Sequence, residues 1–274
     1  MPQFRRIDSL EDPALAPYLT LRRSDEHERT GVFVADGPKL IERVLAAGLT
    51  LESMLCSERW VAPFTPLLAR QVADLPVYVT DEKHLRQLVG FHLFNGVLAV
   101  ARIPVSPSLA TLLAQPAAAP RLWVALDGLA NAENLGSIVR SAVALGAQAV
   151  LCGETCASPW LRRAVRTSMG AMVAVPVLQA ADLAADLRAC ATAGLTCAAA
   201  DAHSGTSLPA AKLDGDLCLV FGSEGHGLRP AVAAACTTTV NIPMTDRVSS
   251  LNVGAAAAIM LYEAARQRRP LPPP

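Results

Sequence analysis

The chain has 274 residues, is 52% hydrophobic and carries 24 basic and 24 acidic residues, so its formal net charge is zero. This length accommodates two domains or one large one, and the apolar content is enough for a substantial core. The neutral balance is unusual for a nucleic-acid-binding protein and counts against that function. The basic residues are nevertheless clustered, and each cluster is either a solvated face or a contact for an anionic partner. The clusters are Arg5 with Arg6, Arg22 with Arg23, Arg162 and Arg163 with Arg166, and Arg266 with Arg268 and Arg269.

Cysteine usage and the N-terminal segment indicate the compartment. The seven cysteines form no C-x-x-C pair and have no accompanying histidine spacing, so we expect reduced thiols and no metal site. The segment MPQFRRIDSLEDP has no apolar run of the kind found in signal peptides. The longest apolar helix expected, near residues 253–262, is shorter than the ~20 residues that span a bilayer. These features predict a cytoplasmic protein without a membrane partner.

The first part of the chain predicts a small α/β domain. Residues 1–30 are polar and charged, and we expect them to be helical in part. From residue 32 to residue 103, short apolar strands alternate with amphipathic helical segments, which is typical of an α/β domain. The proline-rich segment that follows disfavours both helix and strand. We therefore predict a first domain over residues 1–105, a linker over 106–120 and a second domain over 121–274.

The second domain alternates in the same way, but its predicted strands are almost continuously apolar. Such strands, when separated by helices, are typical of a parallel sheet that is covered on both faces. The pattern therefore predicts an open α/β sheet. The strands are expected at 123–127, 149–152, 173–178, 196–200, 217–221 and 239–242, with helical segments at 134–146, 158–170, 182–194, 229–236 and beyond 250.

Three segments of the second domain share a strand–loop–helix form that suits a ligand pocket. The first leads from strand 123–127 to Asn134, Gly136 and Arg140, the second from strand 217–221 to Gly222, Gly225 and Gly227, and the third from strand 239–242 to Ser249 and Ser250. Loops of this kind form a pocket at the carboxyl edge of a parallel sheet. Glycines allow backbone amides to approach a ligand, and a helix N-terminus favours its anionic group.

Each of these features also has a purely structural interpretation. The glycines could form an ordinary turn, and their spacing matches neither a dinucleotide fingerprint nor a nucleophile elbow. Ser250 and Asn134 could be helix caps. Arg140 could be an exposed residue whose stem covers apolar neighbours, and Glu224 could be a solvated loop charge.

Taken together, the three segments resemble the motifs of the SpoU/TrmH family of RNA ribose 2′-O-methyltransferases. The motifs are Asn-x-Gly-x-x-x-Arg at 134–140, Gly-Ser-Glu-Gly-x-Gly-Leu at 222–228, and Ile-Pro-Met at 242–244 followed by Ser-Leu-Asn-Val at 250–253. The resemblance is strong over residues 122–266. It is weaker over residues 20–103, which resemble the substrate-binding domain of many members. Two departures, Asn131 with Ala132 in place of Asp-Pro and Gly254 in place of a serine, leave the substrate open.

The resemblance implies a fold, a cofactor and an assembly. The fold would be a parallel sheet with a trefoil knot at its C-terminal end, preceded by a smaller α/β domain of the L30e-like type. The cofactor would be S-adenosylmethionine (AdoMet), held largely through backbone groups, and the protein would be a homodimer. The residues expected to bind AdoMet are Gly222, Ser223, Gly225, Gly227, Leu228, Ile242, Met244, Leu251 and Asn252.

The reaction implied is transfer of the AdoMet methyl group to a ribose 2′-hydroxyl of tRNA or rRNA, with no metal and no DNA partner. The residues expected to carry it are Arg140, Asn134, Glu224, Ser250 and Asn252. Because arginine is effectively never deprotonated, we favour a role for Arg140 in pairing with a substrate phosphate and stabilising the developing alkoxide. A role as a base aided by the phosphate stays open. The alternatives are a non-catalytic RNA-binding protein on the same fold and a methyltransferase that acts on a base or on a hydroxyl outside RNA.

Overall fold

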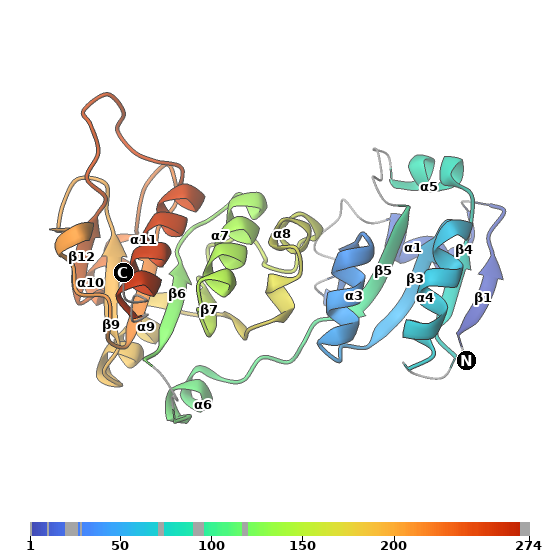
Figure 1. Ribbon diagram of the computed structural model, residues 1–274, viewed down its shortest axis with the longest axis horizontal. Helices are drawn as coiled ribbons and strands as arrows, with labels where there is room; N and C mark the ends of the chain where they lie inside the picture. Colours follow the sequence, from blue (N-terminus) through green and yellow to red (C-terminus); the bar gives the residue numbers. More distant parts are fainter. Residues whose placement is uncertain are drawn as a thin grey trace, which may run out of the picture. The chain divides into compact units, whose positions relative to one another are not determined.

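The computed structural model describes residues 2–9, 11–19, 27, 29–70, 74–89, 96–116 and 120–268 (Figure 1). The chain divides into two compact units. The first unit comprises Met1–Val105 and Trp160–Val173, and the second comprises Ser106–Pro159 and Ala174–Pro274. Three arginines of the basic clusters, Arg22, Arg23 and Arg269, lie outside the described residues.

A five-stranded mixed sheet forms the centre of the first unit. Its strand order is β1–β4–β3–β5–β2, and β5 runs antiparallel to both of its neighbours whereas the other pairs are parallel. The alternation of strands and helices agrees with the α/β pattern of the sequence. The elements are β1 (Gln3–Arg6), α1 (Ala16–Leu19), β2 (Val32–Asp36), α3 (Pro38–Ala46), β3 (Leu51–Cys56), α4 (Val61–Leu68), β4 (Pro76–Val79), α5 (Glu82–Val89) and β5 (Val97–Arg102).

The N-terminal segment contains the expected short helix, α1, and also a strand that the sequence did not predict. All four side chains of β1 are exposed, so they show none of the alternation by which a strand is recognised. Backbone pairing defines this strand instead. The amide of Gln3 donates to the carbonyl of Leu75, and the amide of Ile7 donates to the carbonyl of Val79, both at 2.8 Å.

Residues 160–173 lie in the predicted second domain, yet they belong to the first unit. They include α8 (Arg162–Ser168), which packs against β2. The ring of Trp160 lies 5.2 Å from the ring of Phe33, measured between centroids. The guanidinium of Arg162 donates to the carboxylate of Asp36 at 2.6 Å, and the two side chains are 12% and 8% exposed. An aromatic contact and a nearly buried ion pair therefore attach this segment to the first unit.

The second unit contains a seven-stranded sheet with the order β10–β12–β9–β11–β6–β7–β8, in which every neighbouring pair is parallel. This result confirms the predicted parallel α/β sheet. One strand is shorter than expected, because Ala171–Val173 form a 3-10 turn, and β10 was not predicted. The strands are β6 (Leu122–Leu126), β7 (Ala149–Cys152), β8 (Val177–Gln179), β9 (Thr196–Ala200), β10 (Thr206–Ser207), β11 (Leu217–Phe221) and β12 (Thr238–Asn241).

Helices cover both faces of this sheet. On one face, α9 (Leu183–Thr192) and α10 (Pro230–Ala235) share a core with Trp123, Leu151 and Val220. The residues between these along the strands point to the other face, where α7 (Ala132–Ala144) packs against α11 (Val253–Arg268). No helix in the described part of the chain is long and apolar enough to cross a membrane.

The predicted linker is partly structured. Residues 109–114 form α6 (Leu109–Ala114), which the hydroxyl of Ser108 caps by accepting from the Thr111 amide at 3.1 Å. Leu112 is buried in the same core as α9. The hydroxyl of Ser106 donates to the carbonyl of Val177 at 2.8 Å. The start of the proline-rich segment is thus packed onto the second unit.

A buried carboxylate organises the carboxyl edge of the second sheet. Asp127, which directly follows β6, is fully buried. It accepts from the backbone amide and from Nε of Arg229, both at 2.7 Å. Nη1 of Arg229 also donates to Glu154 at 2.6 Å, and the other oxygen of Glu154 accepts from the Leu183 amide at 3.1 Å. This network joins the ends of β6 and β7 to the starts of α9 and α10.

Arg162→Ala should destabilise the protein by about 3–5 kcal/mol, because it leaves the carboxylate of Asp36 buried without its partner. Chemical denaturation measures the change in the free energy of unfolding. The neighbouring Arg163→Ala is the matched control, since Arg163 is exposed and should change stability by no more than about 0.5 kcal/mol. Equal effects of the two substitutions would show that the ion pair contributes nothing.

Glu154→Gln should lower the melting temperature at neutral pH by an amount that shrinks in acid. The hydrogen bond from Arg229 lowers the pKa of Glu154 to about 2. The ionised carboxylate therefore stabilises the fold fully above the unfolded-state pKa of ~4.3, and this stabilisation is lost as the pH falls towards 2. Calorimetric melting of both proteins between about pH 3 and pH 7 measures the difference. A difference that stays constant over this range would contradict the prediction.

Candidate functional site

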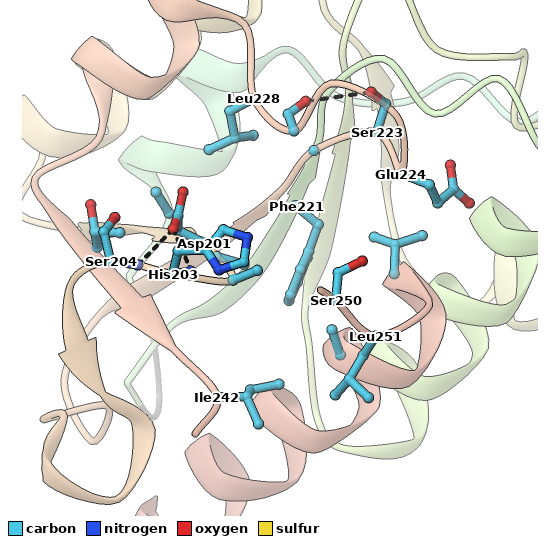
Figure 2. Close-up of a pocket in the computed structure, with 18 of the residues that line it drawn as sticks. Asp201, His203, Ser204, Phe221, Ser223, Glu224, Leu228, Ile242, Ser250 and Leu251 are labelled. Carbon is cyan, nitrogen blue, oxygen red and sulfur yellow. Dashed lines mark hydrogen bonds between the residues drawn. The ribbon is translucent and has the colours of Figure 1, made fainter. Parts of the chain in front are cut away.

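A cavity of about 580 Å³ opens at the carboxyl edge of the second sheet, where β9, β11 and β12 end (Figure 2). Its position is the one expected for a ligand site in a parallel α/β sheet. Figure 2 shows Asp201 and His203 on one side of it and Ser250 and Leu251 on the other. The predicted site residues that line it are Gly222, Ser223, Glu224, Gly227, Leu228, Ile242, Met244, Ser250 and Leu251.

The glycine loop after β11 is a tight backbone hairpin. Ser223 and Gly227 exchange amide-to-carbonyl hydrogen bonds of 3.0 and 2.9 Å. A Cβ on Gly222 would lie 2.2 Å from the carbonyl carbon of Gly227, so no larger residue fits there. Gly227 itself has a φ of +66°, which favours glycine. The turn interpretation of the loop is therefore correct, and the same turn places its backbone against the cavity.

A chain of side-chain hydrogen bonds connects the three motif segments beside the cavity. The amide nitrogen of Asn134 donates to a carboxylate oxygen of Glu224. The amide nitrogen of Asn252 donates to the amide oxygen of Asn134 at 3.3 Å. These residues lie 90 and 118 positions apart in the chain, so the fold alone brings them together. We refer to Glu224, Asn134 and Asn252 as the amide relay.

The helix caps differ from those considered in the sequence. Asn131, not Asn134, caps α7 by accepting from the amide of Glu133 at 2.8 Å. Asn252, not Ser250, caps α11 by accepting from the amide of Gly254 at 2.9 Å. Neither helix therefore uses the side chain of Asn134 or Ser250 as its cap.

Arg140 lies apart from the cavity lining. It is exposed on α7, six residues after Asn134, and its neighbours Ile138 and Val139 are buried. Among the described residues, none forms a hydrogen bond or ion pair with its guanidinium. The predicted site residues Gly225, Asn134 and Asn252 also lie outside the lining, and open space surrounds Gly225. The catalytic role of Arg140 stays a prediction.

The loop after β9 contributes lining residues that the sequence did not identify, namely Asp201, His203 and Ser204. One oxygen of Asp201 accepts from the amides of His203 and Ser204, both at 2.8 Å. The hydrogen bond from the His203 amide contributes most to lowering the pKa of Asp201, and the bond from Ser204 lowers it further. The position of this loop after a predicted parallel strand was a sign that it could line a site. The loop itself contains no recognisable motif.

Comparisons with known proteins identify the family. Residues 121–262 match the family model described as the SpoU rRNA Methylase family. An uncharacterised tRNA/rRNA methyltransferase of Mycobacterium bovis is 36% identical over 93% of this chain and 90% of its own. A 23S rRNA (guanosine-2′-O-)-methyltransferase of a Burkholderia species is 38% identical over 72% of this chain and 79% of its own.

Solved structures give the same result. The AdoMet-bound rRNA methyltransferase of Sinorhizobium meliloti superposes with a TM-score of 0.84 and 25% identity, over 96% of this chain and 98% of that one. The likeness therefore extends over both units rather than over the second alone. Together with the family match to residues 121–262, it means that the chain belongs to the SpoU rRNA methylase family.

Proposed function

We propose that this protein transfers the methyl group of AdoMet to a ribose 2′-hydroxyl of rRNA or tRNA. The observation that carries the proposal is the amide relay, which joins all three motif segments at the rim of one cavity. Two relatives support it, since one is a 23S rRNA (guanosine-2′-O-)-methyltransferase and another was solved with AdoMet bound.

The cavity fits AdoMet in size and in lining. Its volume of about 580 Å³ lies within the ~300–1,000 Å³ that small-molecule pockets typically occupy. Leu228, Ile242, Met244 and Leu251 provide apolar walls suited to an adenine ring. The close approach of Gly222 to Gly227 leaves backbone groups, rather than side chains, at the wall of the glycine loop. AdoMet supplies a methyl group that its sulfonium already makes electrophilic.

Arg140 is proposed to hold the RNA and to stabilise the charge that develops on the ribose oxygen. A planar guanidinium can grip a phosphate through two hydrogen bonds, and its fixed charge favours an alkoxide nearby. In the described structure it has no carboxylate partner that would compete with a phosphate. The amide relay would position the glycine loop and the start of α11, and Ser250 would contact the reacting groups from the cavity wall.

Residues 1–105, together with residues 160–173 of the first unit, would form an L30e-like domain that binds the RNA, and the second unit, which begins at Ser106, would bind AdoMet. The segment after β12 would form a trefoil knot. It leads from β12 to α11, and α11 contacts α7 and β11, which is separated from β12 by β9 in the sheet. We place the enzyme in the cytoplasm, because all seven cysteines are described and free and its substrate is RNA.

Arg140→Ala should reduce single-turnover methyl transfer by roughly a hundredfold to a thousandfold, as expected for loss of one preorganised charge. AdoMet affinity, measured by calorimetry, and melting temperature should stay unchanged. Arg188→Ala, at an exposed position of α9, is the control and should transfer at the wild-type rate.

Nucleoside mass spectrometry of the RNA product distinguishes the alternatives. A 2′-O-methylated nucleoside supports the proposal, and a base-methylated nucleoside would favour the alternative chemistry. If AdoMet binds but no RNA is methylated, the protein is a non-catalytic binder. A wild-type rate in Arg140→Ala would remove this residue from the mechanism.

The protein should also be a homodimer, with α11 at the interface. This helix exposes Ile259 and Tyr262, three residues apart, at 42% and 61% of their surface. Light scattering should give twice the 28.8 kDa chain mass. Ile259→Glu combined with Tyr262→Glu should give the monomer mass, whereas Val105→Glu, at a residue that is 98% exposed, should not. A wild-type monomer would contradict the prediction.

A further inference from the structure

The basic cluster of α8 separates into two kinds of arginine. Arg162 is nearly buried and pairs with Asp36, so its role is structural. Arg163 and Arg166 are exposed, and since they lie three residues apart they share one side of the helix. The opposite side of α8 is buried. The helix, of sequence RRAVRTS, contains no acidic residue. It therefore presents an uncompensated positive edge on the first unit.

The helix α3 brings further positive charge to the same place. The guanidinium of Arg43 donates to the carbonyl of Met169, just after the last turn of α8. A Cβ on Gly170 would lie 2.8 Å from Cδ of Arg43, so glycine is needed for this close approach. Lys39 lies one turn before Arg43 and is also exposed. Glu42 is the one acidic residue of α3.

The positive charges of α8 act on one another. Burial is the main cause that lowers the pKa of Arg162, and Asp36 opposes it. The positive charges of Arg166 and Arg163 lower that pKa further, which places both of them within electrostatic range of Arg162. Within the described residues, no carboxylate forms an ion pair with Lys39, Arg163 or Arg166. The chain as a whole is neutral, so this concentration of cations is local.

We propose that Lys39, Arg43, Arg163 and Arg166 form a surface that binds the phosphate backbone of RNA, which we call the α3–α8 surface. The proposal rests on the proposed function and extends it by naming where the first unit meets its substrate. Three of the four cations are arginines, whose planar fork matches a phosphate. RNA is the polyanion that the proposed reaction requires, and a row of phosphates neutralises several cations at once.

Charge reversal tests this surface. Arg163→Glu combined with Arg166→Glu should weaken binding of a 23S rRNA transcript and of unfractionated tRNA by about tenfold or more. The slope of log affinity against log salt should fall by roughly 1–2, because two phosphate contacts are lost. AdoMet affinity, measured by calorimetry on the same protein, should not change. Arg70→Glu combined with Arg188→Glu is the matched control, since it changes the net charge equally at exposed sites outside α3 and α8.

The outcomes separate the surface from the proposed function. Suppose that the wild type binds and methylates RNA, and that the α8 variant loses no more affinity than the control. The α3–α8 surface then does not bind RNA, and the proposed function stands. If the wild type binds neither RNA and transfers no methyl group, both are wrong. Should the glutamates lower the melting temperature, Arg163→Gln combined with Arg166→Gln gives the same test without reversed charge. A wild-type salt slope in that variant would also overturn the surface.

Discussion

The buried carboxylate of Asp127 is the constraint on which the carboxyl edge of the second unit depends. An ionised carboxylate without partners costs several kcal/mol to bury, so its two oxygens must be satisfied. Both are satisfied by Arg229, through its backbone amide and its guanidinium. Arg229 directly follows the glycine loop, and its other contact is Glu154. The exit of the loop is therefore held in place by the end of β6, while Gly222 sets its entrance through close packing on Gly227.

This arrangement explains why distant residues can act together at one rim. The loop is fixed at both ends, so the carboxylate of Glu224 has a defined position from which it accepts from Asn134. Asn134 in turn accepts from Asn252, whose other amide atom caps α11. One asparagine thus serves both the stability of a helix and the geometry of the site. Substitution of Asn252 would disturb both, which makes it a poor choice for isolating a catalytic effect.

The sequence predicted the second sheet and the place of the cavity because both follow from local patterns. Apolar strands such as Leu217–Phe221, and the glycines that follow them, can be recognised from the local sequence without knowledge of the residues they contact. The features that it missed depend on contacts between distant residues. Arg162 meets Asp36 across 126 positions, β1 is defined only by its backbone bonds, and Asp201 lies in a loop without a motif. The caps lie two or three positions from the residues considered as structural alternatives, since several polar residues precede each helix.

Because residues 160–173 belong to the first unit, the two units cannot be separated by cutting the chain at one point. The polypeptide crosses between the units three times, after residues 105, 159 and 173, so no single cleavage divides them. A fragment that begins after residue 105 would still carry Trp160 and Arg162 but would lack Phe33 and Asp36. Exchange of the N-terminal part between relatives would meet the same difficulty. The N-terminal part of this chain therefore depends for its packing on α8, a helix that follows it in the sequence by more than 50 residues.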